Sequence, residues 1–581
     1  MPIYSADFET RAGSKAEEER LTYVWAWAIC SIDEIHNVDV GNTMNSFIEY
    51  ISALPNKSII YFHNLKFDGK FLIDWLLRNG FMLHKKARTK QSFDCLIDES
   101  GSFYNINIRF TKTQKIEIRD SFKKLTSSVE DLGESFKTEF RKLWIDYIEE
   151  RPQGYELTQQ EIEYVKNDVR VVAECLAYLY SEGMDHMTAS SDCLADFKNV
   201  FAKGKENEER IFRMFFPKLD EYEDGFVRNS YRGGWCYCSR PGVYEGCGNT
   251  YDVNSLYPSM MHSMSGNKYP YCTGRYFKGE YKEDKDFPLY VQHFWARFEI
   301  LPNHLPTLQI KNRKQDWKTN EWVKSSKGDM VELYMTNIDL ELFFNHYEVI
   351  EIYFVDGYKY RAAEGLFDDY IDKWAEVKKT SKGAKRSLAK LMLNGLYGKF
   401  GQRLKLAEKK PELIDDDVKY ITQETEERDG VYIPVAAFVT SYARRFTITA
   451  AQENYNSFIY ADTDSIHMIG EAKGIPIHDK NLCAWKHESE WEYGIFRRQK
   501  TYIEIEKGAT ALNADYVKCA GMPAEAKQKF CHQVAEGKLQ ITDFDVGLCI
   551  EGAKLAPETV KGGVILVATD YTMHDVPALR F

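Results

Sequence analysis

The chain carries two sets of acidic residues, and each set is drawn from segments that lie far apart in the sequence. In one set, Asp462 and Asp464 belong to YADTDS, a short polar turn between the apolar runs SFIY and IHMI. This pattern predicts a β-hairpin with two acids at its tip, although Asp is also a favoured residue of ordinary turns. Asp252 comes much earlier, after a strand-like segment, in YDVNSLYP.

The other set begins with Asp7 and Glu9, which stand two residues apart in the strand-like opening segment IYSADFET. Side chains two residues apart on a strand leave the same face. Neighbouring carboxylates repel, so folding them together requires compensation, most simply by a divalent cation. A D-x-E pair alone is more often a solvated strand face. Two further acids in separate segments favour the metal interpretation: Asp68 in YFHNLKFDGKFL and Asp168 in EYVKND.

Tyr164 lies four residues before Asp168, in a segment from Gln159 to Tyr180 whose apolar spacing predicts an amphipathic helix. The tyrosine and the acid therefore share a helical face. Four acids and a tyrosine from three segments are what two-metal phosphodiester hydrolysis requires, with ions about 4 Å apart. The tyrosine hydroxyl can orient the attacking water.

These segments resemble the DEDD-type 3′→5′ exonuclease domain in its tyrosine variant. The resemblance implies that the acids hold metal and that Tyr164 assists the chemistry together with Lys142, although an ordinary surface lysine would look the same in sequence. It also implies a channel for the single-stranded end of a primer. The residues expected to line this channel are Thr10, His63, Asn64, Phe67, Ser121 and Phe122.

YDVNSLYP and YADTDS, in this order, resemble motifs A and C of family B DNA polymerases. The resemblance implies attack of a primer 3′-hydroxyl on the α-phosphate of a dNTP, for which catalysis is mostly positioning and electrostatic stabilisation. Asp252 and Asp464 would each bridge two Mg²⁺ ions, with the Val253 carbonyl completing one shell and Asp462 supporting them. Mn²⁺ can replace Mg²⁺ at such hard carboxylate sites.

The resemblance also implies a nucleotide pocket. Tyr257 would pack under the sugar and refuse a 2′-hydroxyl sterically, beside Ser255 and Leu256. From Asp372 to Lys410 the chain has twelve Lys or Arg against three acids, in a segment (366–401) expected to be helical. A polar stripe every four residues along one basic helix is also typical of a solvated face, but KLMLNGLYG resembles motif B. The residues expected to contact the dNTP from this segment are Lys378, Arg386, Lys390, Asn394 and Tyr397. The chain departs from the motif at Gly395, where the family usually has Ser.

Shorter segments match DNA-contacting elements of the same polymerases. YRGG (Tyr231 to Gly234, with Gly233) resembles the element that couples the two active sites on the template. Thr440 and Arg444 resemble a template-binding pair, and Lys500 and Tyr502 in RQKTY resemble the K-x-Y that holds the primer terminus.

The spacing between motifs indicates the branch of the family. About a hundred residues separate motif A from the basic segment and about sixty separate motifs B and C, whereas ordinary family B enzymes are much longer and lack inserts at these points. The protein-primed branch has both inserts, and the whole chain resembles its compact phage enzymes of the phi twenty-nine type. In that family the first insert docks a terminal protein that serves as primer. The second insert and the thumb encircle DNA and give processivity and strand displacement.

The expected fold is therefore α/β and multidomain, with an RNase H-like DEDD exonuclease domain and a right-hand polymerase that carries two inserted terminal-protein-region subdomains. In chain order the expected parts are the exonuclease domain (1–188), palm (189–262), insert 1 (263–366), fingers (367–401), insert 2 (402–432), palm (433–520) and thumb (521–581).

The expected partners are template and primer DNA, dNTPs and a terminal protein, with the chain a monomer that forms a heterodimer with the terminal protein at initiation. The net charge of −12 does not exclude DNA, because binding depends on local basic grooves. The twelve cysteines lack zinc spacing and indicate free thiols. No segment approaches the roughly 18 apolar residues of a membrane span. We expect the protein to work in the cytoplasm of an infected bacterial host.

Three alternatives remain open at the level of sequence. A DNA-primed repair polymerase would keep both acid sets and the basic segment but should not need the inserts. A nuclease with a degenerate polymerase region should not retain Asp252, Lys390 and Asp464. A non-enzymatic DNA-binding scaffold should not retain the acids of two independent sites.

Overall fold

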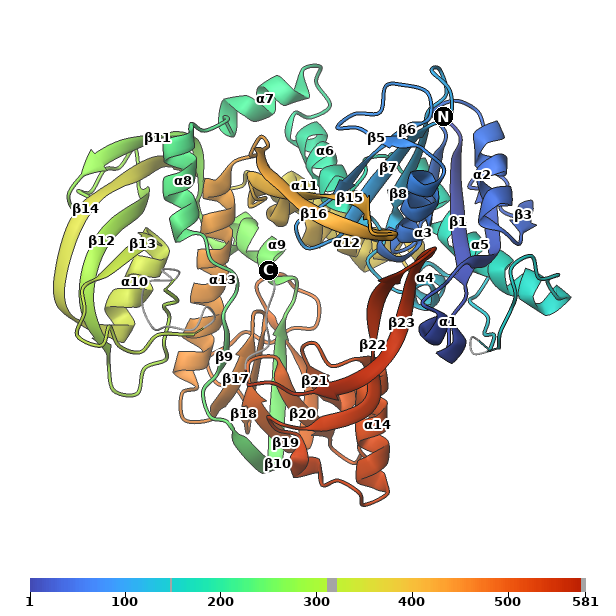
Figure 1. Ribbon diagram of the computed structural model, residues 1–581. Coiled ribbons are helices and arrows are strands. Elements are labelled where there is room, and N and C mark those ends of the chain that lie inside the picture. Colours follow the sequence, from blue (N-terminus) through green and yellow to red (C-terminus); the bar gives the residue numbers. More distant parts are fainter. Residues whose placement is uncertain (147–148, 311–320, 576–581) are drawn as a thin grey trace.

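The computed structural model describes residues 1–146, 149–310 and 321–575, arranged around two large sheets and a smaller one (Figure 1). The first sheet is eight-stranded and mixed, and it carries the N-terminal acids. Its strands, in spatial order, are β3 (Val38–Gly41), β2 (Val24–Ser31), β1 (Ile3–Thr10), β4 (Ile59–Phe62), β8 (Ile116–Asp120), β7 (Phe103–Arg109), β6 (Ser92–Ile97) and β5 (Met82–Leu83).

Helices cover this first sheet because its strands are apolar on both faces. The whole of β4 is buried, and α3 (Leu65–Arg78) packs against β4, β7 and β8. On β1 and β2 lies α5 (Gln159–Ser181), which begins at a capping box formed by Thr158 and Glu161. The predicted amphipathic helix is thereby confirmed. The other helices of this part are α2 (Met44–Ala53), α4 (Val129–Phe136) and the short α1 (Ser14–Glu19), which separates β1 from β2.

The second sheet is seven-stranded and antiparallel, and it carries the remaining acids. Its order is β21 (Val517–Cys519), β20 (Thr501–Glu506), β19 (Trp485–Arg498), β10 (Gly242–Val253), β18 (Ser465–Ile469), β17 (Phe458–Asp462) and β9 (Cys236–Cys238). The predicted acid-tipped hairpin is confirmed as β17–β18. The helix α13 (Ile433–Glu453) is largely buried, and it contacts both β17 and the helix α10 (Asn337–His346) of the next unit.

Between residues 263 and 366 the chain forms a four-stranded sheet and the helix α10. The strand order is β11 (Tyr269–Lys278), β14 (Tyr347–Ala363), β12 (Leu289–Ile300) and β13 (Val331–Thr336). Within 402–432 the chain forms a hairpin of β15 (Lys405–Ile414) and β16 (Asp417–Glu427). The C-terminal part consists of α14 (Ala524–Ala535) and the hairpin β22 (Cys549–Val560)–β23 (Gly563–Thr572).

The prediction of one continuous basic helix is wrong. The segment forms two helices, α11 (Asp368–Thr380) and α12 (Ala384–Phe400), which pack against each other. The break falls at Gly383, whose φ of 59° lies in the left-handed region that glycine adopts without strain. Lys378 therefore belongs to α11 and the other predicted dNTP contacts of the segment to α12. The remaining helices are α6 (Ala189–Phe201), α7 (Glu208–Phe215), α8 (Glu221–Ser230) and α9 (Leu256–Met261).

The turns of the β15–β16 and β22–β23 hairpins lie together with α3 around one aspartate, Asp416. Figure 1 shows the red β22–β23 ribbon approaching α3. Asp416, at the β15–β16 turn, forms ion pairs with Arg78 of α3 and with Lys561 of the β22–β23 turn. The backbone N–H of Thr22 also donates to the Lys561 carbonyl at 3.0 Å. Among the described residues, no helix is both long and apolar enough to span a bilayer.

Candidate active sites

The N-terminal acids converge at the edge where β1 faces α5. Carboxylate oxygens of Asp7, Glu9 and Asp168 all lie within 4.8 Å of one another. Asp68, in the first turn of α3, is 4% exposed, and its pKa is raised by burial and then by the charge of the nearby Asp7. Burial, followed by the charge of Asp168, raises the pKa of Asp7 to about 7. The structure thus joins all four predicted acids in one electrostatically coupled site.

Neighbouring groups fit this site for divalent cations. The Asp168 Oδ1 atom is buried and accepts no hydrogen bond from the described residues, while its Oδ2 atom accepts one from Lys142 Nζ at 2.9 Å. Burial raises the pKa of Glu9, followed by the charges of Asp7 and Asp168, and the nearby Tyr164 hydroxyl acts in the opposite direction. Clustered carboxylates with an unused buried oxygen form a donor set that suits hard cations such as Mg²⁺. Lys142 and Tyr164, which sequence alone could not distinguish from surface or core residues, both border the site.

The residues predicted to line a single-strand channel gather around the start of α3. Asn64 has left-handed backbone geometry at φ 69° and is exposed, and Phe122 is 39% exposed. His63 contacts the Ser121 hydroxyl (2.9 Å) and the Ser127 carbonyl (2.8 Å). Thr10 ends β1, next to the acids of that strand, and Phe67 is half-buried in α3.

Ser121 does not line a channel, contrary to the prediction. Its side chain is completely buried, because its hydroxyl donates to the Phe62 carbonyl at 3.1 Å and contacts His63. Sequence reasoning also missed Asp120, whose Oδ1 accepts hydrogen bonds from the backbone N–H groups of Asn64 and Phe122, both at 3.0 Å. Asp120 holds the two predicted channel loops together. No spacing pattern marks it, since its partners are backbone atoms.

The second site forms where β10 meets the β17–β18 turn. Asp252 is paired in register with Ser465, and the N–H of Val253 donates to the Asp464 carbonyl at 2.7 Å. Burial, followed by the charge of Asp464, raises the pKa of Asp252 to about 7. The two carboxylates therefore repel at close range, as a site that binds a cation requires.

Asp462 faces a different partner. Its carboxylate accepts hydrogen bonds from Lys500 Nζ at 2.9 and 3.2 Å and from the Tyr460 hydroxyl at 3.3 Å. The N–H of Lys500 in turn donates to the Tyr460 hydroxyl at 2.9 Å. This pairing neutralises Asp462 and fits the supporting role expected for it. Tyr502, the other predicted primer contact, lies on β20 beside the Tyr460 ring.

Basic residues border this second site from α11 and α12. Lys378 Nζ donates to the Ser255 hydroxyl at 2.9 Å, and Arg386 donates to the Lys378 carbonyl at 2.7 Å. Burial, followed by the charges of Lys390 and Arg386, lowers the pKa of Lys378. Three cations thus act on one another next to Asp252. Asn394 and Lys390 are exposed on α12, whereas Leu256 is buried at 2% exposure.

The departure from the motif at Gly395 has a steric cause. A Cβ atom at this position would lie 2.6 Å from the Sγ atom of Cys193 in α6. Cys193 is fully buried and also approaches the Leu391 carbonyl of α12. The glycine therefore permits α6 and α12 to pack closely.

Thr440 and Arg444 lie in the interior, each 1% exposed, and neither can contact a template from there. The Thr440 hydroxyl donates to carbonyls of its own helix, α13. Arg444 pairs with Asp339 at 3.0 and 2.6 Å and donates to the carbonyls of Arg232 and Gly233. The prediction of direct DNA contacts is therefore wrong for this pair. Arg444 instead anchors the YRGG loop through the loop's carbonyls. Its ion-pair partner, Asp339, was missed by sequence reasoning.

The YRGG loop also touches the acid-bearing turn. A Cβ atom at Gly234 would lie 2.5 Å from the Thr463 side chain, and the Thr463 N–H donates to the Trp235 carbonyl at 2.8 Å. The Tyr231 hydroxyl lies close to Gly401, at the end of α12. This loop is therefore packed between the second site and α12.

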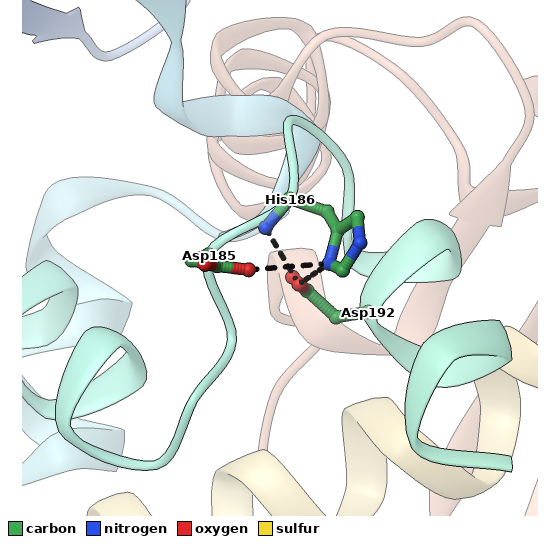
Figure 2. Close-up of side chains that lie close together, drawn as sticks. All are labelled: Asp185, His186 and Asp192. Carbon is green, nitrogen blue, oxygen red and sulfur yellow. Dashed lines mark hydrogen bonds and ion pairs between the residues drawn. The ribbon is translucent and has the colours of Figure 1, made fainter. Parts of the chain in front are cut away.

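A third group of residues has metal-like spacing but is internally satisfied. Figure 2 shows Asp185, His186 and Asp192 facing one another at the start of α6. The Asp192 carboxylate accepts from the His186 N–H (2.9 Å), lies 3.0 Å from His186 Nδ1 and forms an ion pair with buried Lys124. Lys124 already neutralises Asp192, so this cluster does not need a cation. The Lys124–Asp192 pair instead ties the domain of the first sheet to α6.

Comparisons with known proteins agree with this arrangement. A family described as DNA polymerase type B, organellar and viral, matches residues 50–151 and 144–473. The chain is 38% identical over 595 residues to the DNA polymerase of Bacillus phage phi29, covering 98% of this chain and 99% of that protein. It is 33% identical to the DNA polymerase of Streptococcus phage Cp-1, covering 99% of both.

A solved structure of phi29 DNA polymerase complexed with primer-template DNA and incoming nucleotide substrates superposes with a TM-score of 0.87 at 36% identity. The superposition covers 98% of this chain and all of the other chain.

Proposed function

This chain belongs to the type B DNA polymerases, among the phi29-type phage enzymes, and we propose that it starts DNA synthesis on a protein primer, proofreads its product and displaces the strand ahead. It is a DNA-directed DNA polymerase, and enzymes of this family depend on metal ions. The observation that carries the finer proposal is the presence of two separate carboxylate sites on two separate sheets.

For synthesis, Asp252 and Asp464 would hold the cations that bind the primer end and the triphosphate. Two Mg²⁺ ions, when bound, supply stabilisation of the charge that develops on the phosphoryl oxygens. Lys378, Arg386 and Lys390 bring positive charge to the triphosphate. Lys500 keeps Asp462 neutralised and, with Tyr502, faces the primer terminus.

For proofreading, Asp7, Glu9, Asp68 and Asp168 hold two cations, and Tyr164 orients the water that attacks the terminal phosphodiester. Lys142 stabilises charge next to Asp168. The exposed Asn64 and Phe122, fixed by Asp120, face the unpaired primer end. The raised pKa of Asp7 supports this role because it reports a buried carboxyl next to the charge of Asp168, and a bound cation favours the ionised form of such a group.

The partners follow from the relatives. phi29 DNA polymerase has been solved with single-stranded DNA, with primer-template DNA and with incoming nucleotides, and we extend these partners to the present chain. We further assign terminal-protein docking to 263–366. To the β15–β16 and β22–β23 hairpins we assign a ring around DNA, supported by their meeting at Asp416. The proposed domains keep the limits expected from the sequence, and the enzyme would act as a monomer in the host cytoplasm, pairing with the terminal protein at initiation.

A singly primed, single-stranded DNA circle with four dNTPs and Mg²⁺ tests this proposal. Products many times longer than the circle would support synthesis with strand displacement and an encircling ring. Products that stop at one circumference would contradict those two properties and favour a DNA-primed repair polymerase. Protein priming is tested separately, by transfer of a labelled nucleotide to the phage's terminal protein in the absence of any DNA primer.

A further inference from the structure

A chain of hydrogen bonds lies beneath the polymerase carboxylates and plays no part in the function proposed above. His467 Nδ1 lies 2.7 Å from Glu504 Oε1, and His467 Nε2 lies 3.1 Å from the Ser465 hydroxyl. The Thr250 hydroxyl donates to the same Glu504 oxygen at 3.0 Å. Three strands, β18, β20 and β10, therefore contribute to one polar network inside the sheet.

The chemistry of the partners fixes the direction of these bonds. An ionised Glu504 can only accept, so Nδ1 of His467 carries the proton and donates it to the carboxylate. In the neutral imidazole, Nε2 is then an acceptor, and the Ser465 hydroxyl donates to it. Glu504 thus selects the tautomer of His467, and His467 selects the orientation of Ser465.

This network lies on the same face of the sheet as the metal-type acids. Across β10 and β18, Asp252 pairs with Ser465 and Thr250 pairs with His467. Partners in an antiparallel pair share a face, as do residues two apart on a strand. Ser465 also follows Asp464 directly in the chain. The Ser465 hydroxyl therefore lies on the same face of the sheet as the Asp252 side chain, one residue along the chain from Asp464.

The imidazole is also packed among the residues expected to hold the primer. His467 is 2% exposed, with its ring centroid 5.0 Å from that of Tyr460 and 5.1 Å from that of Tyr502. Tyr460 contacts Asp462 and Lys500 through its hydroxyl. One histidine thus contacts both the acid-bearing hairpin and the K-x-Y segment.

We propose that His467, oriented by Glu504, is a positioning residue for DNA synthesis that fixes the Ser465 hydroxyl and, with it, the turn carrying Asp464. The proposal rests on the proposed assignment of Asp252 and Asp464 to the polymerase site. A histidine that merely filled the core could be replaced by phenylalanine, since Phe496 and Tyr502 already form an aromatic surround. A positioning histidine could not, because phenylalanine orients no hydroxyl.

The test compares His467→Phe, Ser465→Ala and the double variant with His487→Phe as a matched control. His487 belongs to β19 of the same sheet and bonds to Asn249 at 2.8 Å, but it pairs with Tyr251, whose side chain leaves the opposite face from Asp252. Each variant is assayed for the single-turnover rate of nucleotide addition at saturating dNTP, the dNTP KM and the Mg²⁺ concentration at half-maximal rate. Exonuclease rate on single-stranded DNA and the thermal midpoint report folding.

We expect His467→Phe and Ser465→Ala each to lower the maximal rate by about tenfold or more, since small misplacements at reacting centres are costly. The double variant should be no slower than the slower single variant, because both changes remove the same orienting unit. The dNTP KM, exonuclease rate and thermal midpoint should stay near wild type. His467→Gln, whose amide can still bond to Ser465, should recover part of the rate, and His487→Phe should resemble wild type.

A wild-type rate for His467→Phe would overturn the proposal. So would rate losses that multiply in the double variant, or equal losses of exonuclease activity and thermal stability, which would indicate a general structural role. Asp464→Ala distinguishes failure of the polymerase-site assignment from failure of the positioning role of His467. If that variant still synthesises DNA, the site assignment itself fails, whatever His467 does.

Discussion

The rings of Tyr257 and Tyr397 lie 4.0 Å apart, centroid to centroid, with their planes inclined by 33°. This contact joins the segment that follows β10 to helix α12, and each ring is only partly exposed. Because the two rings pack this closely, neither side chain has much freedom to move aside. The pair forms one boundary of the proposed nucleotide pocket.

Replacing Tyr257 with valine should admit ribonucleotides. The smaller side chain no longer blocks the volume beside the 2′-position, whereas Asp252 and Asp464 are unchanged. We expect the ratio of kcat/KM for dNTP over rNTP to fall by about two orders of magnitude, within the range that steric discrimination supplies. Steady-state incorporation of dCTP and CTP opposite dG measures this ratio. Unchanged discrimination would contradict the steric role, and Tyr397→Phe, which keeps the ring, is the control.

A larger side chain at Gly395 should destabilise the packing of α6 on α12. Gly395→Val places atoms where Cys193 Sγ lies, and overpacking of a core costs about 1–3 kcal/mol. The Cys193→Ala background should relieve much of this cost, because the nearest remaining side-chain atom would be the Cβ at 3.8 Å. Chemical denaturation of the wild type, the Gly395→Val and Cys193→Ala variants and the double variant measures the coupling free energy between the two positions. Strictly additive effects would show that the two residues do not compete for space.

Removing the carboxylate of Asp339 should leave the Arg444 cation buried without its partner. Breaking a buried ion pair in this way costs about 3–5 kcal/mol, so Asp339→Ala should lower the unfolding free energy markedly. The matched control is Glu341→Ala on the same helix, whose exposed carboxylate lies 3.7 Å from Arg445 and should contribute about 0–1 kcal/mol. Equal effects of the two substitutions in denaturant melts would contradict the anchoring role of Arg444.

Stability should depend on pH through the active-site acids. The folded-state pKa values of Asp7 and Asp252 are raised to about 7, above their unfolded values, so their protonated forms favour folding. This contribution is fully present below about pH 4 and is lost as pH rises through about 7. Mg²⁺ compensates the charged forms, so its stabilising effect should be larger at pH 8 than at pH 6. Thermal melts with and without Mg²⁺ measure the difference, which should shrink when both residues are replaced by asparagine.

The sequence predicted most successfully what local patterns determine. The polar turn between two apolar runs identified the hairpin carrying Asp464, and the apolar spacing from Gln159 identified α5. The acids could be grouped into two sets because two-metal chemistry restricts the residue types that can serve as metal ligands. The break at Gly383 was missed, since periodic lysines continue through it and only the backbone's positive φ reveals it.

Tertiary partners explain the other errors. Arg444 was expected to bind the template, but its counter-charge, Asp339, is distant in the sequence and no local pattern shows that the two pair in the interior. Ser121 looked like a channel residue because nothing local shows that its hydroxyl bonds to the Phe62 carbonyl. Burial of a polar side chain depends on which partner the fold supplies, and short motifs do not contain that partner.

The central claim is that the chain has two independent carboxylate sites, one for synthesis and one for proofreading. Asp464→Ala and Asp7→Ala test it most directly, each assayed for primer extension and for degradation of a single-stranded 3′ end. We predict that Asp464→Ala abolishes extension and keeps degradation, and that Asp7→Ala does the reverse. Loss of both activities in either variant, with the thermal midpoint unchanged, would contradict the account.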